Sequence, residues 1–80
     1  MFAENKYTTW YNNICSKDYD GEIYEIHHKI PRCMGGSDEP ENLVKLSPKA
    51  HFICHWLLTK MTDGKTRHKM FWAFNFMLLK

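Results

Sequence analysis

The histidines constrain this chain more than any other feature, because four of the five lie between residues 25 and 55. His51 and His55 are four residues apart, so a helix through them places both rings on one face. His27 and His28 are adjacent and end a segment rich in strand-forming residues. A glycine-containing turn and a second strand would fold that segment back onto the helix. The pattern predicts a small metal site built from one strand and one helix.

Length and composition exclude several classes of protein. Eighty residues make one small domain, 1–80, and such a domain buries only about 60% of its unfolded surface. A bound metal ion can supply stability that so small a core lacks. No apolar run approaches the length of a membrane span and no signal segment is evident, so we expect no membrane association and an intracellular location. Three cysteines without CxxC spacing argue against a disulfide framework and a four-cysteine zinc site.

Apolar periodicity and turn residues predict an α+β fold. Ser47-Pro48 is a strong helix start, with Ser as the N-cap and Pro at the first helical position. Asp63-Gly64 is expected to end that helix. Helices are predicted at 4–15, 48–61 and 66–79, and strands at 22–28 and 42–46. The two strands and the middle helix form a core over about 22–62, with a helix on either side of it in the chain.

The predicted last helix is apolar on two sides. One stripe is expected to pack against the apolar stripe of the first helix; these stripes are Met70, Phe71, Phe74 and Met77, and Tyr7, Trp10, Tyr11 and Ile14. The remaining apolar residues of the last helix are Trp72, Phe76 and Leu79. Because exposed apolar patches usually mark an interface, this side predicts a homodimer through the helix or docking on a larger partner. The alternative is that both stripes are buried within one monomer.

The histidine pattern also suggests two roles, metal ligand and general base. Three nitrogens from His27, His51 and His55 would leave a fourth coordination position open, which is typical of catalytic sites. Neighbours on a strand point to opposite faces, so His28 is available as a general base, a role that neutral histidine performs near pH 7. Asn42 is expected to hydrogen-bond backbone across the loop and orient that imidazole. The alternatives are a helical HxxxH pair without metal and an ordinary turn asparagine.

Basic residues are concentrated towards the C-terminus. Residues 60–80 hold five basic residues and one acidic residue, whereas residues 1–28 hold two basic and five acidic. A basic region suits a polyanion such as DNA, although it is also typical of a solvated helix face. The candidate phosphate contacts are Lys29, Arg32, Lys45, Lys49, Lys65, Arg67 and Lys69.

Four sequence motifs extend the argument to a known family. They are Tyr24-Glu-Ile-His-His-Lys-Ile-Pro-Arg32, Gly35-Gly36-Ser-Asp38, Glu41-Asn-Leu-Val-Lys-Leu46 and His51-Phe-Ile-Cys-His55-Trp. Together they resemble the HNH endonuclease family, in particular its phage and intron-encoded branch. Bacterial nuclease toxins of the colicin type share the Glu-x-His-His and HxxxH parts. The resemblance implies a ββα-metal (His-Me finger) fold, with the three letters carried by His28, Asn42 and His51.

The resemblance also implies roles for the residues. His27, His51 and His55 would hold one divalent metal ion, His28 would be the general base, and Glu25 would be a carboxylate that supports a ligand. The implied activity is hydrolysis of double-stranded DNA with Mg²⁺ or Mn²⁺, leaving 5′-phosphate and 3′-hydroxyl ends, while Zn²⁺ or Ni²⁺ could also occupy the site. Such an enzyme would be encoded by a phage or mobile element and act in the cytoplasm of a host bacterium.

Two alternatives remain at this point. One is a zinc-stapled nucleic-acid-binding module without catalysis. The other is a nuclease subunit that is active only within a larger complex. The second histidine of the pair favours the enzyme, because a structural metal site does not need it.

Overall fold

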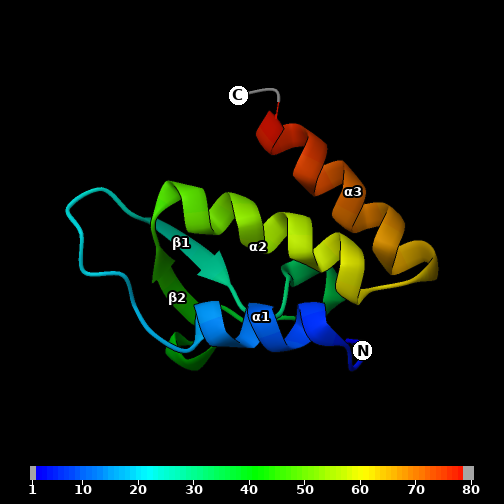
Figure 1. Ribbon diagram of the computed structural model, residues 1–80, viewed down its shortest axis with the longest axis horizontal. Helices are drawn as coiled ribbons and strands as arrows, with labels where there is room; N and C mark the ends of the chain where they lie inside the picture. The colour runs from blue at the N-terminus through cyan, green and yellow to red at the C-terminus, as the bar shows by residue number, and fades with distance from the viewer. Residues whose placement is uncertain (1, 79–80) are drawn as a thin grey trace.

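The computed structural model describes residues 2–78. The elements, in chain order, are helix α1 (Lys6–Cys15), strand β1 (Glu25–His28), the 3-10 turns η1 (Arg32–Met34) and η2 (Pro40–Asn42), strand β2 (Leu43–Leu46), and helices α2 (Pro48–Met61) and α3 (Gly64–Leu78). β1 and β2 form an antiparallel pair that α2 follows directly (Figure 1). The predicted α+β fold, two strands and a helix flanked by two further helices, is confirmed.

The register of the two strands determines which side chains face α2. Glu25 pairs with Leu46 and His27 pairs with Val44. His27, Val44 and Leu46 are all buried, whereas Ile26, between Glu25 and His27, is exposed. The strand pair therefore has one face on the core and one face in solvent, and His27 lies on the core face as strand alternation requires.

β1 is shorter than the predicted strand, beginning at Glu25 rather than at Glu22. The loop before it reaches across to β2, where Asp18 accepts a hydrogen bond from the Lys45 amide at 2.8 Å. The Tyr19 amide in turn donates to the Lys45 carbonyl at 2.8 Å. These two hydrogen bonds satisfy backbone groups on the outer edge of β2 and hold the loop there. Residues 22–24 belong to this loop and do not continue β1.

The connection between the strands is folded tightly. The Gly36 amide donates to the Pro31 carbonyl at 3.0 Å, and a Cβ atom at Gly36 would collide with the carbonyl oxygen of Ile30. Only glycine permits this close approach. The loop therefore folds back beside the end of β1, which places its side chains near the histidine pair.

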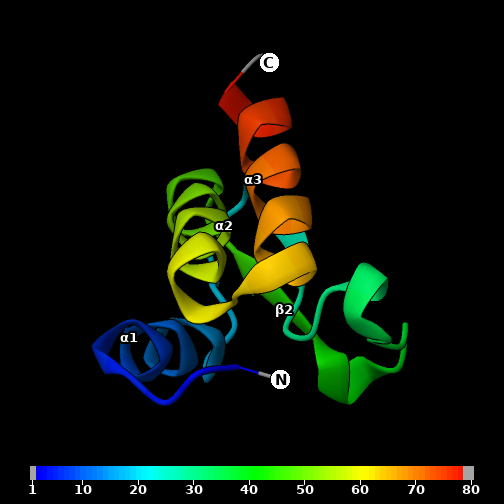
Figure 2. The same ribbon diagram turned by 90° about the vertical axis from the view of Figure 1, so that its right-hand side faces the viewer.

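The two flanking helices pack on α2 and not chiefly on each other. In two perpendicular views α2 lies between α1 and α3 (Figures 1 and 2). The Phe74 ring of α3 lies 5.0 Å from the Phe52 ring of α2, and Met70 is buried. Trp10 of α1 meets Trp56 of α2 edge-on at 6.0 Å between ring centroids. The prediction that the stripes of the first and last helices pack together is therefore wrong.

The physical reason lies in the composition of α2. Leu57, Leu58 and Met61 are fully buried, while Phe52 and Trp56 offer apolar surface on other sides of the same helix. A helix with apolar residues around most of its circumference can pack against more than one neighbouring helix. The remaining side of α3 is exposed; its large apolar residues there are Phe71, Trp72, Phe76 and Leu78. Leu79, predicted for the same side, lies outside the described residues.

The helix boundaries follow from local chemistry. The Ser47 hydroxyl accepts a hydrogen bond from the Ala50 amide at 3.1 Å, which caps the N-terminus of α2 as predicted. Gly64 does not simply end α2, because it adopts a positive φ of 56° and begins α3. In the described part of the chain, no helix is both long enough and apolar enough to cross a membrane.

Candidate metal centre and active site

Three histidines converge where β1 meets α2. One ligand nitrogen from each of His27, His51 and His55 lies within 4.8 Å of the others. The centroids of the rings are 5.1 Å apart for His27 and His51, 5.2 Å for His27 and His55, and 4.8 Å for His51 and His55. The helical i, i+4 spacing stacks two of the rings, and the strand register brings the third against them. The structure thus brings together the three residues that the sequence pattern predicted as metal ligands.

Burial disfavours the protonated form of two of these imidazoles, those of His27 and His55. Burial lowers the pKa of His27 to about 3, and the neighbouring imidazoles of His55 and His51 lower it further. The pKa of His55 falls to about 4 for the same reasons, burial first and His51 second. A neutral imidazole offers a nitrogen lone pair, which is the form that binds a metal ion. The rings of His27 and His55 are therefore better suited to binding a metal ion than to taking up protons.

Glu25 sets the orientation of His51. The Nδ1–H group of His51 donates to Oε1 of Glu25 at 2.7 Å. The opposite nitrogen, Nε2, then carries the lone pair and lies 3.1 Å from Nε2 of His55. Glu25 and His27 are two residues apart on β1 and share a strand face, so one strand supplies both a histidine and the carboxylate that supports another. The predicted supporting carboxylate lies at the site.

Tyr11 holds His27 in a similar way. The apolar pattern of the first helix predicted only a core position for this tyrosine. Its hydroxyl donates to the Lys29 carbonyl at 2.7 Å and lies 2.6 Å from Nε2 of His27. Because a phenol has a single proton, His27 must donate its Nε2–H to the Tyr11 oxygen. The lone pair of His27 is then on Nδ1. A tyrosine inside an otherwise apolar stripe was the available signal, because a buried hydroxyl needs a partner.

The third imidazole, that of His55, donates its Nε2–H to Nε2 of His51, because that nitrogen of His51 carries the lone pair. Nδ1 of His55 is buried and has no hydrogen-bond partner among the described residues. Its Nε2, which faces Nε2 of His51, is therefore available to give up a proton and bind a cation. Together, the oriented rings of His27 and His51 and the adaptable ring of His55 meet the requirements of a three-nitrogen site.

His28 points to different partners, as alternation along the strand predicts. Its Nε2–H lies 2.8 Å from Oδ1 of Asp38, and Nε of Arg32 lies 3.8 Å from the same oxygen. The hydrogen bond from His28 lowers the pKa of Asp38, and the Arg32 charge lowers it further. The carboxylate holds the proton on Nε2, which leaves Nδ1 of His28 as a proton acceptor. Asp38 was not singled out as a site residue, because a turn aspartate before the second strand has many ordinary roles.

Asn42 braces the loop that carries these groups and does not contact His28 itself. Its side chain accepts from the Ile30 amide at 2.9 Å and donates to the Ile30 carbonyl at 3.0 Å and the Ser37 carbonyl at 2.8 Å. The Asn42 carbonyl also accepts from the Lys29 amide at 2.7 Å. The predicted hydrogen bonds to backbone across the loop are present. They fix the residues directly after His28 and directly before Asp38.

A shallow cavity joins the two sets of residues. Its volume is about 180 Å³, and it is lined by Ile26, His27, His28, Pro31, Arg32, His51 and His55. Arg32 is the basic side chain in this wall. Lys45 instead lies over the Tyr24 ring at 4.8 Å, and Arg67 of α3 lies over the Phe71 ring at 5.5 Å. The other predicted phosphate contacts, Lys29, Lys49, Lys65 and Lys69, are also not part of the cavity wall.

Comparison with known proteins gives a clear set of relatives. "Probable mobile endonuclease E" of Enterobacteria phage T4 is 48% identical over 64 residues, which are 75% of this chain and 45% of the relative. "Probable mobile endonuclease C" of the same phage is 60% identical over 42 residues, 52% of this chain and 20% of the relative. The chain is similar to phage mobile endonucleases. "Probable mobile endonuclease D" is 43% identical over 63 residues, 69% of this chain and 24% of the relative.

The similarity covers only part of the length of each relative. The chain spans less than half the length of each of these curated phage proteins. No family model matches the chain. No solved structure matches it either.

Proposed function

We propose that this chain is an HNH-type nuclease encoded by a phage or mobile element, which hydrolyses double-stranded DNA in the host cytoplasm with one divalent metal ion. The observation that carries the proposal is the convergence of three histidines beside a fourth, His28, whose proton is held on one nitrogen by Asp38. The similarity to phage mobile endonucleases supports a nuclease rather than a purely structural metal site.

The residues present fit a divalent cation. Two of the three imidazoles are locked with a lone pair available, through Glu25 and Tyr11, and the third faces its neighbour at 3.1 Å between nitrogens. Imidazole ligands suit Zn²⁺ and Ni²⁺, whereas Mg²⁺ prefers oxygen and keeps several of its waters. Bound by His27, His51 and His55, a divalent ion would polarise the scissile phosphate and stabilise the leaving 3′-oxygen.

The other steps belong to side chains of this protein. Nδ1 of His28 takes the proton of the attacking water, and the imidazolium that results is stabilised by the Asp38 carboxylate at its opposite nitrogen. Arg32, in the cavity wall, contacts the phosphate. Attack of the water on phosphorus breaks the bond to the 3′-oxygen, which takes up a proton from solvent, so the products are a 5′-phosphate and a 3′-hydroxyl. Asn42 keeps the loop in place so that His28 and Asp38 stay aligned.

DNA binding beyond the cleavage site rests on the basic residues outside the cavity. Lys49 at the start of α2, and Lys65, Arg67 and Lys69 on α3, are exposed. Each phosphate contact releases counterions, so the affinity for DNA should fall steeply as salt is raised. We infer that these residues, with Lys29 and Lys45, hold the duplex while Arg32 contacts the scissile phosphate.

A plasmid assay tests the proposal. Purified protein is incubated with supercoiled plasmid in EDTA or with Mg²⁺, Mn²⁺, Ni²⁺ or Zn²⁺ added singly, and the nicked and linear products are separated on a gel. We expect cleavage with at least one of these ions and none in EDTA. Protein that binds the plasmid and a metal ion yet produces no nick with any of the four ions would favour the non-catalytic binding module instead.

A further inference from the structure

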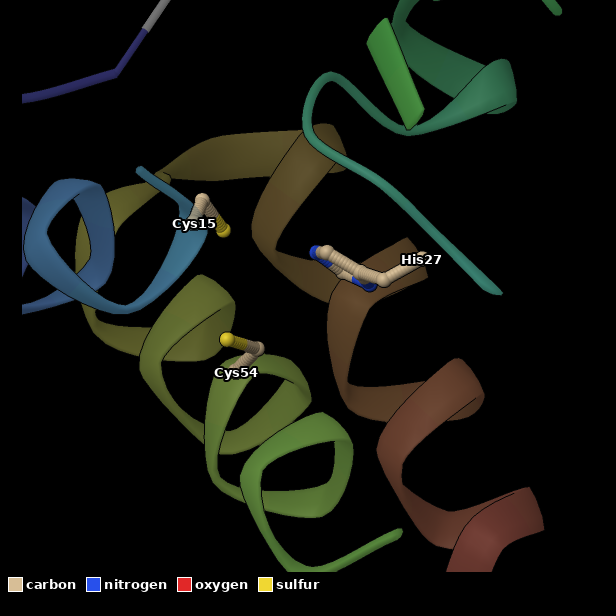
Figure 3. A group of neighbouring side chains, drawn as sticks. All are labelled: Cys15, His27 and Cys54. Atoms are coloured by element: carbon tan, nitrogen blue, oxygen red, sulfur yellow. The ribbon is translucent and has the colours of Figure 1, made fainter. Parts of the chain in front are cut away.

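A second group of metal-binding side chains lies on the opposite side of His27 from His51 and His55. Cys15 at the end of α1 and Cys54 of α2 approach His27 so that their two sulfurs and one ring nitrogen lie within 4.8 Å of one another. Figure 3 shows the two sulfurs facing the same space and one nitrogen of the His27 ring directed towards it. All three side chains are buried, with at most 4% of any residue exposed.

This group is more than two thiols enclosed in an apolar core. The ligand atoms of Cys15 and Cys54 lie within 4.8 Å of each other and of a ring nitrogen of His27. Tyr11 lies one helical turn before Cys15 and bonds Nε2 of His27, so Nε2 is the nitrogen on this side of the ring. Two sulfurs and one imidazole nitrogen form the donor set that thiophilic ions select.

The distances suit such an ion. Zinc binds sulfur at about 2.3 Å and nitrogen at about 2.0–2.1 Å, so ligand atoms around one ion lie roughly 3.5–4 Å apart. Donor atoms already within 4.8 Å of one another reach that spacing through small side-chain rotations. Two thiolates also balance the double positive charge, which reduces the cost of placing a divalent ion in a buried position.

An entry path is present as well. A cavity of about 370 Å³ opens beside Cys15 and Tyr11, and its other lining residues are Phe2, Asn12, Ser16, Lys29 and Ile30. It is separate from the cavity of the three-histidine cluster, which is lined by different residues. An ion can therefore approach Cys15 without passing the proposed active site.

We propose that Cys15, Cys54 and Nε2 of His27 form a second metal site, selective for a thiophilic divalent ion such as Zn²⁺ or Cd²⁺. The two sites are mutually exclusive, because they use opposite tautomers of one imidazole. The three-histidine site needs the lone pair on Nδ1 and the proton on Nε2, whereas the sulfur site needs the lone pair on Nε2. The sulfur site does not depend on the proposed nuclease activity.

Cadmium titration of the full chain tests this assignment. With one equivalent of ¹¹³Cd²⁺, we expect a sulfur-to-cadmium absorption band in the ultraviolet and a ¹¹³Cd resonance in the range of mixed sulfur and nitrogen coordination, saturating at one ion per chain. The Cys15→Ser/Cys54→Ser variant should lose the band and shift the resonance to the range of nitrogen and oxygen ligands. Cys33→Ser is the matched control, because Cys33 is exposed and should leave both signals unchanged.

The wild-type spectra are decisive even if the double variant fails to fold. A wild-type resonance in the nitrogen and oxygen range, without the absorption band, would overturn the proposal. Loss of the band in Cys33→Ser would overturn it as well, because the sulfur ligand would then be the exposed cysteine. Binding of two ions per chain, one of them through sulfur, would refute the mutual exclusion of the sites.

Discussion

The tautomer of a single imidazole, that of His27, depends on one hydroxyl group. Tyr11 accepts a hydrogen bond from the Nε2–H of His27 at 2.6 Å and donates one to the Lys29 carbonyl at 2.7 Å. A phenylalanine would fill the same space without fixing the ring. Residues that orient a ligand in this way typically affect metal affinity by about 10–100-fold.

We therefore expect Tyr11→Phe to weaken Ni²⁺ binding at the three-histidine site by about tenfold or more, measured by calorimetric titration. The loss of a buried hydroxyl should also lower the free energy of unfolding by about 1–3 kcal/mol. Tyr7→Phe is the control, because Tyr7 lies on the same helix but packs against Trp56. An affinity equal to that of the wild type would show that the tautomer of His27 is fixed by something other than Tyr11.

The proposed base can be separated from the ligands by mutation. His28→Ala should reduce cleavage by about 10²–10⁴-fold, the usual effect of losing a general base, and should leave metal affinity unchanged. Plasmid cleavage and calorimetry are measured on the same sample. His68→Ala is the matched control, since His68 is an exposed histidine on α3 that bonds Trp72. Undiminished cleavage by His28→Ala would refute the role of this residue.

The buried imidazoles make the stability of the metal-free protein depend on pH. Burial lowers the pKa of His27 from 6.5 to about 3 and that of His55 from 6.5 to about 4. Between those values the unfolded chain binds more protons than the folded chain. Stability is thus fully present above pH 6.5 and falls as the pH is lowered, by up to about 1.4 kcal/mol per pH unit for each histidine.

Urea unfolding in EDTA at pH 8, 7, 6 and 5 measures this effect. The free energy of unfolding should change little between pH 8 and 7 and decline below pH 6.5, where the unfolded histidines take up protons. The His27→Ala/His55→Ala variant should show a flatter profile if it folds. A wild-type profile that stays level down to pH 5 would contradict the neutral state assigned to these two histidines.

At the scale of the elements, the loop between β1 and β2 is as important as the strands. Asn42 is 8% exposed, and its side-chain amide joins the two ends of this loop through Ile30 and Ser37. Ser37 directly precedes Asp38, the residue that bonds His28. The asparagine therefore acts on the proposed base through the backbone of the loop.

Asn42→Ala should reduce the rate of cleavage and the free energy of unfolding, the latter by about 1–3 kcal/mol for the buried groups left without partners. Metal affinity should be retained, because the three ligand histidines lie outside the loop. Cleavage kinetics, urea unfolding and calorimetry give the three readouts, with Asn75→Ala on the exposed side of α3 as control. Loss of metal binding together with cleavage would instead indicate that Asn42 supports the fold as a whole.

The sequence predicted the elements well where local signals are strong. The bounds of α2, Pro48 to Met61, follow from the Ser47 cap and the apolar pattern. It also predicted that His27, His51 and His55 meet, because helix and strand periodicity fix the faces. It could not predict the contact of Tyr11 with His27, which joins residues 16 apart through the packing of α1. The position of Asp38 likewise depends on the tight fold of an irregular loop.

At the scale of the whole molecule, the outer side of α3 exposes large apolar side chains to solvent. Trp72 is 60% exposed and Phe76 is 68% exposed. The alternative that both stripes of this helix are buried in one monomer is therefore not what the structure shows for these two residues. Association with a second copy through α3 stays a prediction, and a symmetric dimer would present two cleavage sites to one duplex.

Light scattering distinguishes the possibilities. We expect wild-type protein to have the mass of a dimer and Trp72→Glu/Phe76→Glu to have the mass of a folded monomer, because the changes lie on exposed positions. Lys69→Glu, also exposed on α3, is the control for altered charge. A monomeric wild type would refute the dimer, and unfolding of the double variant would show that the two residues support the core.

The central position of α2 has a consequence for how the sequence can diverge. α1 and α3 each pack on this helix (Figure 2). Substitutions on α1 and α3 that share no partner on α2 should have additive free energies, so such a change on one outer helix should neither require nor repair a change on the other. Divergence of α3, with its basic and apolar surface, can therefore proceed while α1 and the histidines of α2 stay as they are. Substitutions within α2 have no such independence, because each alters the contacts of two neighbours at once.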